Sequence, residues 1–192
     1  MKQKSIQEIF THLPTLESER LLFRPILPED AEDMYAYSCQ ENVTAYLLWE
    51  AHPDLPYTAS YIQYLQERYA LGDYYDWAII SKKEKKMIGT VGFTNIDCAN
   101  NCAEIGYVIH PDYWGCGYAT EAAKEILRFG FLTMGLSRIS GVCMKENKAS
   151  LRVMIKCGMQ YEGTMRSAIV AKGRRRDVCV AAITREDFEE NK

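Results

Sequence analysis

The most regular pattern of hydrophobic and polar positions lies in residues 104–128, and it predicts a strand, a turn and a helix. Residues 104–109 are mostly apolar and β-branched, which indicates a buried strand. Beyond the turn, apolar residues recur at spacings of three and four, which predicts an amphipathic helix. These helical positions are Ala119, Ala122, Ala123, Ile126 and Leu127. Gly115 and Gly117 stand between strand and helix, where they allow the backbone to turn sharply and to approach a ligand closely.

The chain before this stretch shows helical and extended patterns in turn. Apolar residues at helical spacing predict a short helix or arm at residues 5–10, and residues 16–26 predict a first edge strand broken by Pro25. An acidic turn at residues 28–30 predicts the start of a helix, and Thr58 is expected to cap a second one. The expected inward faces of these helices are Ala31, Met34, Tyr35 and Ser38, and Ile62, Leu65 and Tyr69.

The remaining patterns complete a mixed fold. The expected further strands are 77–81, 87–96, 104–109, 138–144, 161–171 and 177–184. A helix over residues 147–157 is expected to end at Gly158, because glycine commonly stops a helix. Strands and helices mix without regular βαβ alternation, so we predict an α+β fold with a mixed, mostly antiparallel sheet flanked by helices.

Length, composition and charge limit the classes of protein. The 192 residues suggest one domain, which we assign to residues 15–187, with an arm or short helix at 1–14 and a tail at 188–192. The net charge of −3 does not favour nucleic acid, and no apolar run approaches the ~20 residues that a membrane span needs. The N-terminus lacks the apolar core of a signal peptide.

The cysteines and histidines give no pattern of metal ligands. Seven scattered cysteines are typical of free thiols in a reducing compartment, so we expect a cytoplasmic protein. Cys98 and Cys102 have the spacing of a metal-binding pair, but no second pair accompanies them and the three histidines are isolated. We therefore expect no metal.

The glycine turn before the helix predicts an anion site. The first N–H groups of a helix are unpaired and carry the positive end of its dipole, which suits a phosphate. A phosphate-binding P-loop would need a Lys-Ser or Lys-Thr pair after the glycines, and none follows. A dinucleotide-binding turn would need a third glycine where Thr120 stands. Both alternatives are therefore disfavoured.

The segment instead resembles the acetyl-coenzyme A signature of the GNAT N-acetyltransferases, [QR]-x-x-G-x-[GA]. Gly117 and Ala119 match this signature, and Trp114 stands where Gln or Arg is usual. The wider run, E-I-G-Y-V-I-x-P-x-Y-W-G-x-G-Y-A-T-E-A, resembles the Rim-type branch, the ribosomal-protein N-acetyltransferases and their relatives. Residues 16–24 resemble the L-x-[ST]-E-R-L-x-L-R that opens those domains. The resemblance implies the GNAT fold, an α/β/α arrangement whose central sheet is splayed in a V that admits coenzyme A.

The resemblance also implies acetyl-coenzyme A as co-substrate and two binding segments. Backbone N–H groups at Val108 and Ile109 would hold the thioester carbonyl. The turn would hold the pyrophosphate through Trp114, Gly115, Cys116, Gly117, Tyr118, Ala119 and Thr120. A second signature, similar to N-x-x-[AS]…K-x-G-F, begins at Asn147 and adds Ser150. Asn147 is equally a good N-cap for the helix that follows it.

Acetyl transfer needs a base for the amine and a proton for the thiolate. Glu104 is the candidate base, because a lone carboxylate on an apolar strand must be paired, solvated or turned toward a cleft. The alternative is an ion pair at the edge of the sheet. Many relatives carry a Tyr proton donor where this chain has Met154, so Ser150 becomes the candidate acid. Glu121 is expected to support the start of its helix.

The acceptor site is the part that the sequence defines least. Trp49 and Glu50 fall where relatives bind the acceptor, and Glu50 is a second candidate base. Tyr37 and Tyr46 are candidates to line the same cleft, although aromatic residues at such spacing are more often core. Residues 172–176 are strongly basic and are expected to form a solvated hairpin tip, with a contact to ribosomal RNA as the weaker alternative.

The sequence therefore predicts an acetyl-coenzyme A-dependent N-acetyltransferase, acting by direct attack in a ternary complex. The acceptor would be a protein N-terminal α-amine or a small-molecule amine, such as an antibiotic or a polyamine. A non-catalytic acyl-coenzyme A-binding module is the alternative, because the usual tyrosine is missing at Met154. No nucleic acid or membrane partner is expected, and both a monomer and a homodimer remain open.

Overall fold

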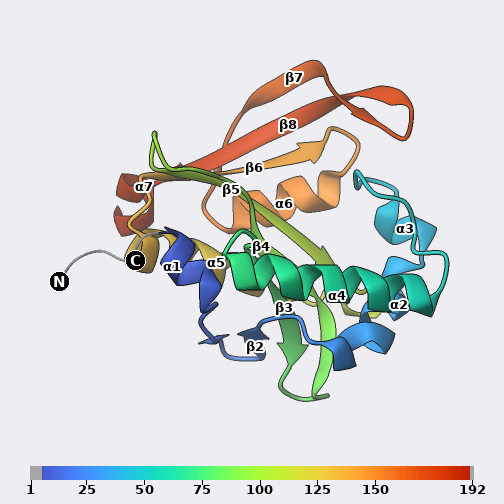
Figure 1. Cartoon of the computed structure of the whole chain (residues 1–192). Coiled ribbons are helices and arrows are strands. Elements are labelled where there is room, and N and C mark those ends of the chain that lie inside the picture. The colour runs from blue at the N-terminus through green and yellow to red at the C-terminus, as the bar shows by residue number, and fades with distance from the viewer. Residues whose placement is uncertain (1–5, 191–192) are drawn as a thin grey trace.

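A computed structural model describes residues 6–190, so the first five residues of the expected arm and the last two of the tail lie outside the described residues. Its strands form one eight-stranded sheet in the order β1-β2-β3-β4-β5-β6-β8-β7 (Figure 1). Every pair of neighbours is antiparallel except β5 and β6, which are parallel. The predicted α+β fold with a mixed, mostly antiparallel sheet is therefore confirmed.

Helices and strands follow one another along the chain without a repeating unit. The helices are α1 (Ile6–Thr11), α2 (Ala31–Ser38), α3 (Glu41–Thr44), α4 (Leu55–Leu71), α5 (Tyr118–Phe129), α6 (Lys148–Lys156) and α7 (Arg185–Glu190). The strands are β1 (Leu16–Glu17), β2 (Leu21–Arg24), β3 (Asp76–Ser81), β4 (Lys86–Asp97), β5 (Cys102–Ile109), β6 (Arg138–Met144), β7 (Gln160–Ala171) and β8 (Arg174–Thr184). The central strand, turn and helix predicted over residues 104–128 are all present.

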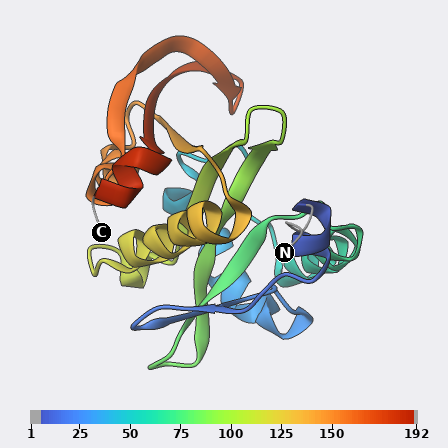
Figure 2. The same cartoon turned by 90° about the vertical axis from the view of Figure 1, so that its left-hand side faces the viewer.

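Hydrophobic side chains on the two faces of the sheet build two cores. α5 and α6 cover one face, and α2 and α4 cover the other (Figure 2). Because successive strand residues point to opposite faces, Trp77 and Ile79 of β3 enter the first core while Ala78 and Ile80 enter the second. The apolar stripe predicted for α5 is buried in the first core.

Several boundaries differ from the sequence prediction. Residues 16–26 form the hairpin β1–β2 and not one strand, because a turn separates Glu17 from Leu21. Asp54, and not Thr58, caps α4, since the Asp54 carboxylate accepts from the amide of Tyr57 at 2.8 Å. Residues 174–176 belong to β8, so the hairpin tip is shorter than expected.

Two helices also differ from the expectation. Tyr37 is buried on the inward face of α2, while Tyr35 is only half-buried, because the face is set by the packing of α2 on α4 and β4. The sequence analysis did not predict α7. Its Phe188 stacks on the ring of Phe131 with centroids 4.8 Å apart, which attaches the helix to the first core.

The sheet divides between β5 and β6. These strands pair only from Cys102–Ile105 to Arg138–Gly141, and both continue beyond that point without pairing. α6 packs closely where they separate, because a Cβ atom added to Gly141 would lie 2.5 Å from Sδ of Met154. The residues of β5 after Ile105 therefore have an open edge toward β6, which is the splay that the resemblance implied.

Candidate active site

The turn that leads into α5 exposes main-chain N–H groups. Gly115 and Gly117 have φ angles of 75° and 84°, a left-handed conformation that favours glycine. The first amide bonded back into the helix is that of Glu121, which donates to the carbonyl oxygen of Gly117 at 3.0 Å. The amides of Tyr118, Ala119 and Thr120 are thus free at the positive end of the helix dipole. This arrangement fits a pyrophosphate group.

The β1–β2 hairpin fixes this turn from the side. Arg20 donates through Nε to Oε2 of Glu121 at 2.6 Å and through Nη1 to the carbonyl oxygen of Cys116 at 3.1 Å. Oε1 of Glu121 accepts from the Ser18 hydroxyl at 2.7 Å and from the amide of Arg20 at 2.8 Å. Burial favours a higher pKa for Glu121, but these donors outweigh it and hold the pKa below its usual value. The sequence analysis did not foresee this contact, although the S-E-R motif of residues 18–20 carries it.

The open end of β5 offers an amide to a ligand. The carbonyl oxygen of Val108 faces Gly89 on β4, and the amide of His110 donates to Ile88 of β4 at 2.8 Å. Because neighbouring residues of an antiparallel strand direct their polar groups to opposite edges, the amide of Ile109 points toward the splay. The indole Nε1 of Trp114 donates to the carbonyl oxygen of Ile109 at 2.7 Å, which ties the turn to the end of the strand.

The start of α6 contacts β5 through a pair of hydroxyl groups. Oδ1 of Asn147 accepts from the amide of Ser150 at 3.1 Å, so the predicted N-cap is confirmed. The hydroxyl groups of Ser150 and Tyr107 lie 3.0 Å apart, and Tyr107 also donates to the Ser150 carbonyl oxygen at 3.0 Å. Burial raises the pKa of Tyr107, so this phenol stays protonated. Met154 is buried in the core and donates no proton.

The sequence analysis did not identify Tyr107. The alternation of side chains along β5 could have revealed it. This alternation places residues 105, 107 and 109 on the α6 face and residues 104, 106 and 108 on the other face. A phenol hydroxyl group thus reaches the proton-donor region from β5, and not from the position of Met154 on α6.

Glu104 lies on the face of the sheet that α2 and α4 cover, one residue before the last pair between β5 and β6. Its Oε1 accepts from the Thr94 hydroxyl at 3.0 Å, where a bulge in β4 places Thr94 beside it. Within residues 6–190, Glu104 forms no ion pair, so the structure does not support the alternative of an edge salt bridge. Its carboxylate and the hydroxyl pair are on opposite faces of β5.

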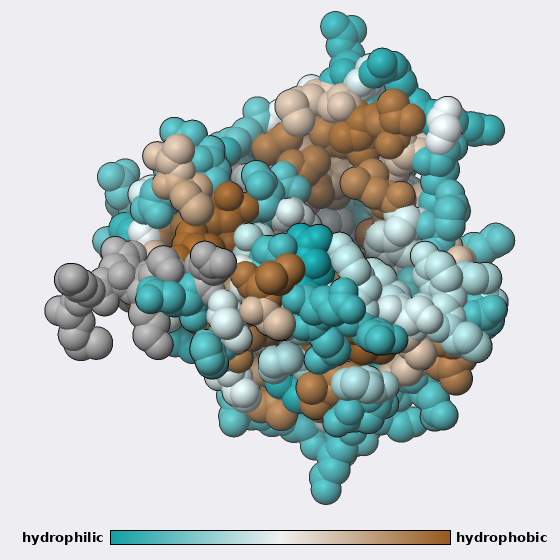
Figure 3. Space-filling view, in the orientation of Figure 1, coloured by the Kyte–Doolittle hydropathy of each residue, from teal (hydrophilic) through white to brown (hydrophobic). Residues whose placement is uncertain are grey.

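The loop between α3 and α4 carries the predicted acceptor residues. The Trp49 ring is 36% exposed and lies 5.4 Å from the ring of His52. Glu50 is exposed and pairs with Nζ of Lys172, at the tip of the β7–β8 hairpin, at 3.3 Å. Figure 3 shows hydrophobic side chains gathered along this hairpin and a hollow between it and α4. The basic tip therefore contacts the chain's own loop through Lys172.

His52 holds this loop in place. Its Nδ1 lies 3.0 Å from the Ser38 hydroxyl and 2.8 Å from the Thr58 hydroxyl, and burial lowers its pKa. Tyr57 and Tyr61 of α4 pack their rings against the imidazole. A neutral imidazole that bonds two hydroxyl groups is a structural link between α2 and α4.

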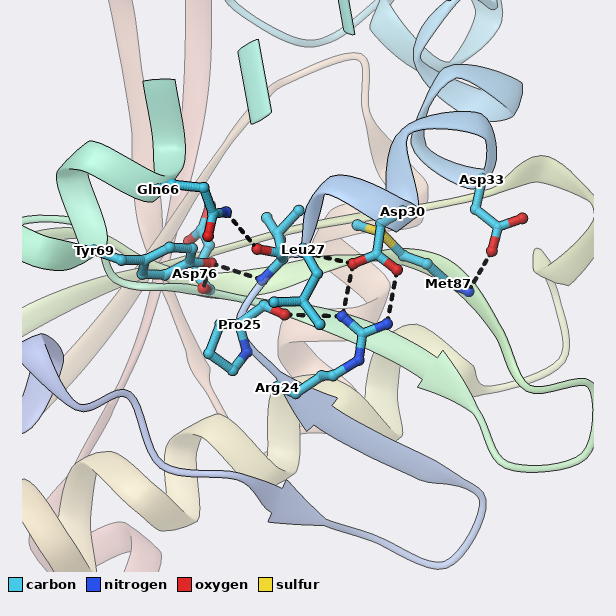
Figure 4. Close-up of polar contacts among 10 residues, drawn as sticks. Arg24, Pro25, Leu27, Asp30, Asp33, Gln66, Tyr69, Asp76 and Met87 are labelled. Carbon is cyan, nitrogen blue, oxygen red and sulfur yellow. Dashed lines mark hydrogen bonds and ion pairs between the residues drawn. The ribbon is translucent and has the colours of Figure 1, made fainter. Parts of the chain in front are cut away.

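Hydrogen bonds fasten α2 and α4 to the sheet (Figure 4). Arg24 of β2 donates through both Nη atoms to the Asp30 carboxylate at 2.6 and 2.7 Å. Gln66 of α4 donates to the carbonyl oxygen of Ile26 at 2.7 Å, and Asp33 of α2 accepts from the amide of Met87 at 2.9 Å. These hydrogen bonds attach α2 and α4 to the face of the sheet on which Glu104 lies.

Two classes of site are not found in the part of the chain that the structure describes. Its residues include no group of three or more His, Cys, Asp or Glu side chains arranged to hold a metal ion. None of its helices is long and apolar enough to cross a membrane.

Comparison with known proteins identifies the family. Residues 20–160 match the family model described as acetyltransferase (GNAT) domain. The uncharacterised N-acetyltransferase YoaA of Bacillus subtilis (strain 168) is 35% identical over 90% of this chain and 97% of its own. The solved structure of a GNAT-family acetyltransferase from Bacillus anthracis is 30% identical, with a TM-score of 0.80 over 90% of this chain and 99% of that one.

Two further similarities are with proteins whose acceptor is named. The spermidine N(1)-acetyltransferase of Escherichia coli (strain K12) is 25% identical over 92% of this chain and 91% of its own. The structure of ribosomal-protein-S5-alanine acetyltransferase from Vibrio fischeri is 21% identical, with a TM-score of 0.77 over 91% of this chain and 98% of that one, and this likeness concerns the fold alone.

The chain belongs to the GNAT acetyltransferase family, and it has the fold of that family with a mixed sheet flanked by helices. It is an N-acetyltransferase that uses acetyl-coenzyme A, and its neighbours include ribosomal-protein-alanine acetyltransferase-like proteins. The residues present fit this co-substrate, because the amides of the glycine turn and the open edge of β5 lie next to each other along the chain.

Proposed function

We propose that this enzyme transfers the acetyl group directly to a primary amine while both substrates are bound at the splay. The main support for this proposal is the position of the candidate base and the candidate acid on either side of β5. Glu104 lies on one face of this strand, and the Tyr107–Ser150 hydroxyl pair lies on the other. A base on the amine side and an acid on the thiolate side are what direct transfer requires.

Each residue has a defined task in this proposal. Acetyl-coenzyme A supplies the thioester carbon that the amine attacks. Glu104 accepts the amine proton, directly or through an ordered water molecule, since an alkylammonium with a pKa near ~10 is not nucleophilic at neutral pH. The amide of Ile109 donates to the carbonyl oxygen, where negative charge develops. Ser150, bonded to Tyr107, donates a proton to the departing sulfur.

The binding residues follow from the same geometry. The N–H groups of residues 115–120 hold the pyrophosphate, with Trp114 fixing the turn through Ile109. Asn147 supports this site by capping α6, which sets the position of Ser150. Val108 contributes its side chain to the acceptor face, because that side chain packs against the core under α2 and α4. Its carbonyl oxygen is turned to β4. Trp49 and Glu50 border the acceptor from the α3–α4 loop.

The acceptor is a primary amine of a small molecule or of a protein N-terminus. Similarity to a spermidine acetyltransferase supports the first class, and the fold shared with a ribosomal-protein-alanine acetyltransferase is compatible with the second. Seven free cysteines support a cytoplasmic location, where thiols stay reduced.

Steady-state kinetics with Glu104→Gln tests this function. Varying acetyl-coenzyme A and an amine together should give intersecting reciprocal plots, because both substrates are bound before transfer. Glu104→Gln should lower kcat/KM at neutral pH by tenfold or more and recover in part at high pH, where more of the amine is neutral. Glu162→Gln, which removes an exposed partner of Arg138, is the control and should behave as the parent. Parallel plots, or normal activity of Glu104→Gln at neutral pH, would refute the proposed chemistry.

A further inference from the structure

Asp76 is a half-buried carboxylate at the start of β3, on the face that α2 and α4 cover, and the acetyl-transfer chemistry above does not use it. The Tyr74 hydroxyl donates to its Oδ2 at 3.2 Å. The Tyr69 hydroxyl of α4 donates to its main-chain carbonyl oxygen at 2.7 Å and accepts from the amide of Ile26 at 3.2 Å (Figure 4). Two phenol groups therefore adjoin Asp76, and main-chain groups hold that of Tyr69 on both sides.

The carboxylate leans toward β5. A Cβ atom added to Gly92, the partner of Asp76 on β4, would lie 2.3 Å from Oδ1 of Asp76, so this oxygen lies over the Gly92 backbone. Gly92 is paired in turn with Gly106 of β5. Neither glycine has a side chain on the face between Asp76 and the open edge of β5. The Thr94 methyl group, which lies over Gly106, borders this strip on the side of Glu104.

Nothing in the described residues balances the charge of Asp76. It forms no ion pair there, and Tyr74 is the one donor to its carboxylate within residues 6–190. Burial raises the pKa of Asp76 to about 6, and the Tyr74 bond offsets only part of this effect. Burial also raises the pKa of the phenols around it, so these tyrosines stay neutral; they are Tyr37, Tyr61, Tyr69 and Tyr74. A carboxylate with neutral aromatic neighbours is a binding site for a cation.

We propose that Asp76 and its tyrosines bind a second ammonium group of the acceptor, which makes the acceptor a small diamine or polyamine. This inference rests on the proposed function, because it assumes that the reacting amine lies at the splay between β5 and β6. β3 lies two strands from β5, about 10 Å away, and the Asp76 side chain extends about 3 Å of that distance toward Gly92. An ammonium held there is thus about 5–7 Å from an amine beside Gly106, where the open edge of β5 begins. Three or four methylene groups span this distance, since each bond is about 1.5 Å long.

Direct binding to the coenzyme A-loaded protein tests the second ammonium site without any turnover. The probes are putrescine, with two amines separated by four carbons, and butylamine, with one amine. The parent should bind putrescine at least tenfold more tightly by calorimetry, and Asp76→Asn should lose this preference while butylamine affinity is unchanged. Asp73→Asn is the matched control, because Asp73 is an exposed partner of Arg68 only three residues away. It should keep the preference.

A pH series on the parent gives a second measurement that needs no variant. The putrescine preference should fall between pH 7 and pH 5 as Asp76 is protonated, since the four neighbouring tyrosines do not titrate there. Equal putrescine affinity in the parent and a folded Asp76→Asn would overturn the site, as would a parent that does not distinguish putrescine from butylamine. Acetylation of N-terminal peptides by a parent that does not bind putrescine would overturn it too. Tight, Asp76-dependent putrescine binding without acetyl transfer would instead refute the proposed function and leave the ammonium site standing.

Discussion

The hydroxyl groups of Tyr107 on β5 and Ser150 on α6 lie 3.0 Å apart, at the point where the sheet divides. The contact joins the strand with the open edge to the helix that packs behind it. Ser150 is thereby bonded to a phenol that burial keeps protonated. A hydroxyl pair of this kind can deliver a proton although the expected tyrosine of α6 is replaced by Met154.

The hydroxyl pair predicts a shared effect of two substitutions. Ser150→Ala should lower kcat about tenfold, which is ~1.4 kcal/mol of barrier, with little change in coenzyme A affinity. Tyr107→Phe should lower kcat by a smaller factor, and the double variant should resemble Ser150→Ala because both act on one proton. Tyr161→Phe, which loses an exposed hydroxyl bonded to Thr164, is the control. Full turnover in Tyr107→Phe, with chemistry rate-limiting, would show that the contact is only structural.

The Arg20–Glu121 pair predicts a loss of binding without a matching loss of stability. Exposed ion pairs contribute only about 0.2–1 kcal/mol, so Arg20→Ala should lower the Tm slightly. Because Arg20 also bonds Cys116, the substitution should loosen the turn and raise the Kd of coenzyme A about three- to tenfold. Arg138→Ala removes a comparable two-bond pair with Glu162, far along the chain, and should change only the Tm. Equal affinity in both variants would remove Arg20 from the binding site.

A substitution of Gly117 should affect both stability and coenzyme A binding, whereas a matched substitution elsewhere should affect stability alone. A side chain at Gly117 meets a left-handed backbone with a φ of 84°, which costs roughly 1–2 kcal/mol, and it would also stand where the phosphate approaches. Gly173 has a φ of 70° and open space around it, so Gly173→Val carries similar strain at a distant turn. Both variants should melt at a similarly lowered temperature by calorimetry. Coenzyme A binding should be abolished only in Gly117→Val, and retained binding there would contradict the assignment of the turn.

Asp76 predicts a stability that depends on pH in an unusual direction. Its folded pKa of about 6 exceeds the ordinary 3.8, so the folded state binds the proton more tightly than the unfolded state. The carboxyl therefore contributes stability below pH 3.8 that is lost as the pH rises through 6. Asp76→Asn stays neutral, so its Tm relative to the parent should rise from pH 4 to pH 8. Melting curves over this pH range check the prediction, and a Tm difference that stays constant with pH would contradict it.

The local patterns of the sequence determined most of the elements and the cofactor site. The glycine turn, the stripe of α5 and the cap at Asn147 depend on neighbouring residues, so spacing alone revealed them. Asn147 needs only the amide of Ser150, three residues away, to act as a cap. One boundary that failed, the turn of β1–β2, depends on distant contacts, because its Ser18 and Arg20 bond a carboxylate about a hundred residues later.

Only the tertiary structure decided how distant segments meet. The sequence identified Ser150 and Glu104 as candidates, but it could not show that Tyr107 lies beside Ser150. Nor could it show that Glu104 bonds Thr94 and forms no ion pair within the described residues. Strand register and helix packing create these contacts. Asp76 lay just outside the strand predicted at residues 77–81, and the sequence analysis assigned it no role. The cation site proposed for it depends on two glycines that strand pairing places beside it. It also depends on tyrosines that come from α2, α4 and the loop before β3. The pKa of a carboxyl group and the ligands that it binds depend on its burial and its neighbours, and these are set by the fold and not by the local sequence.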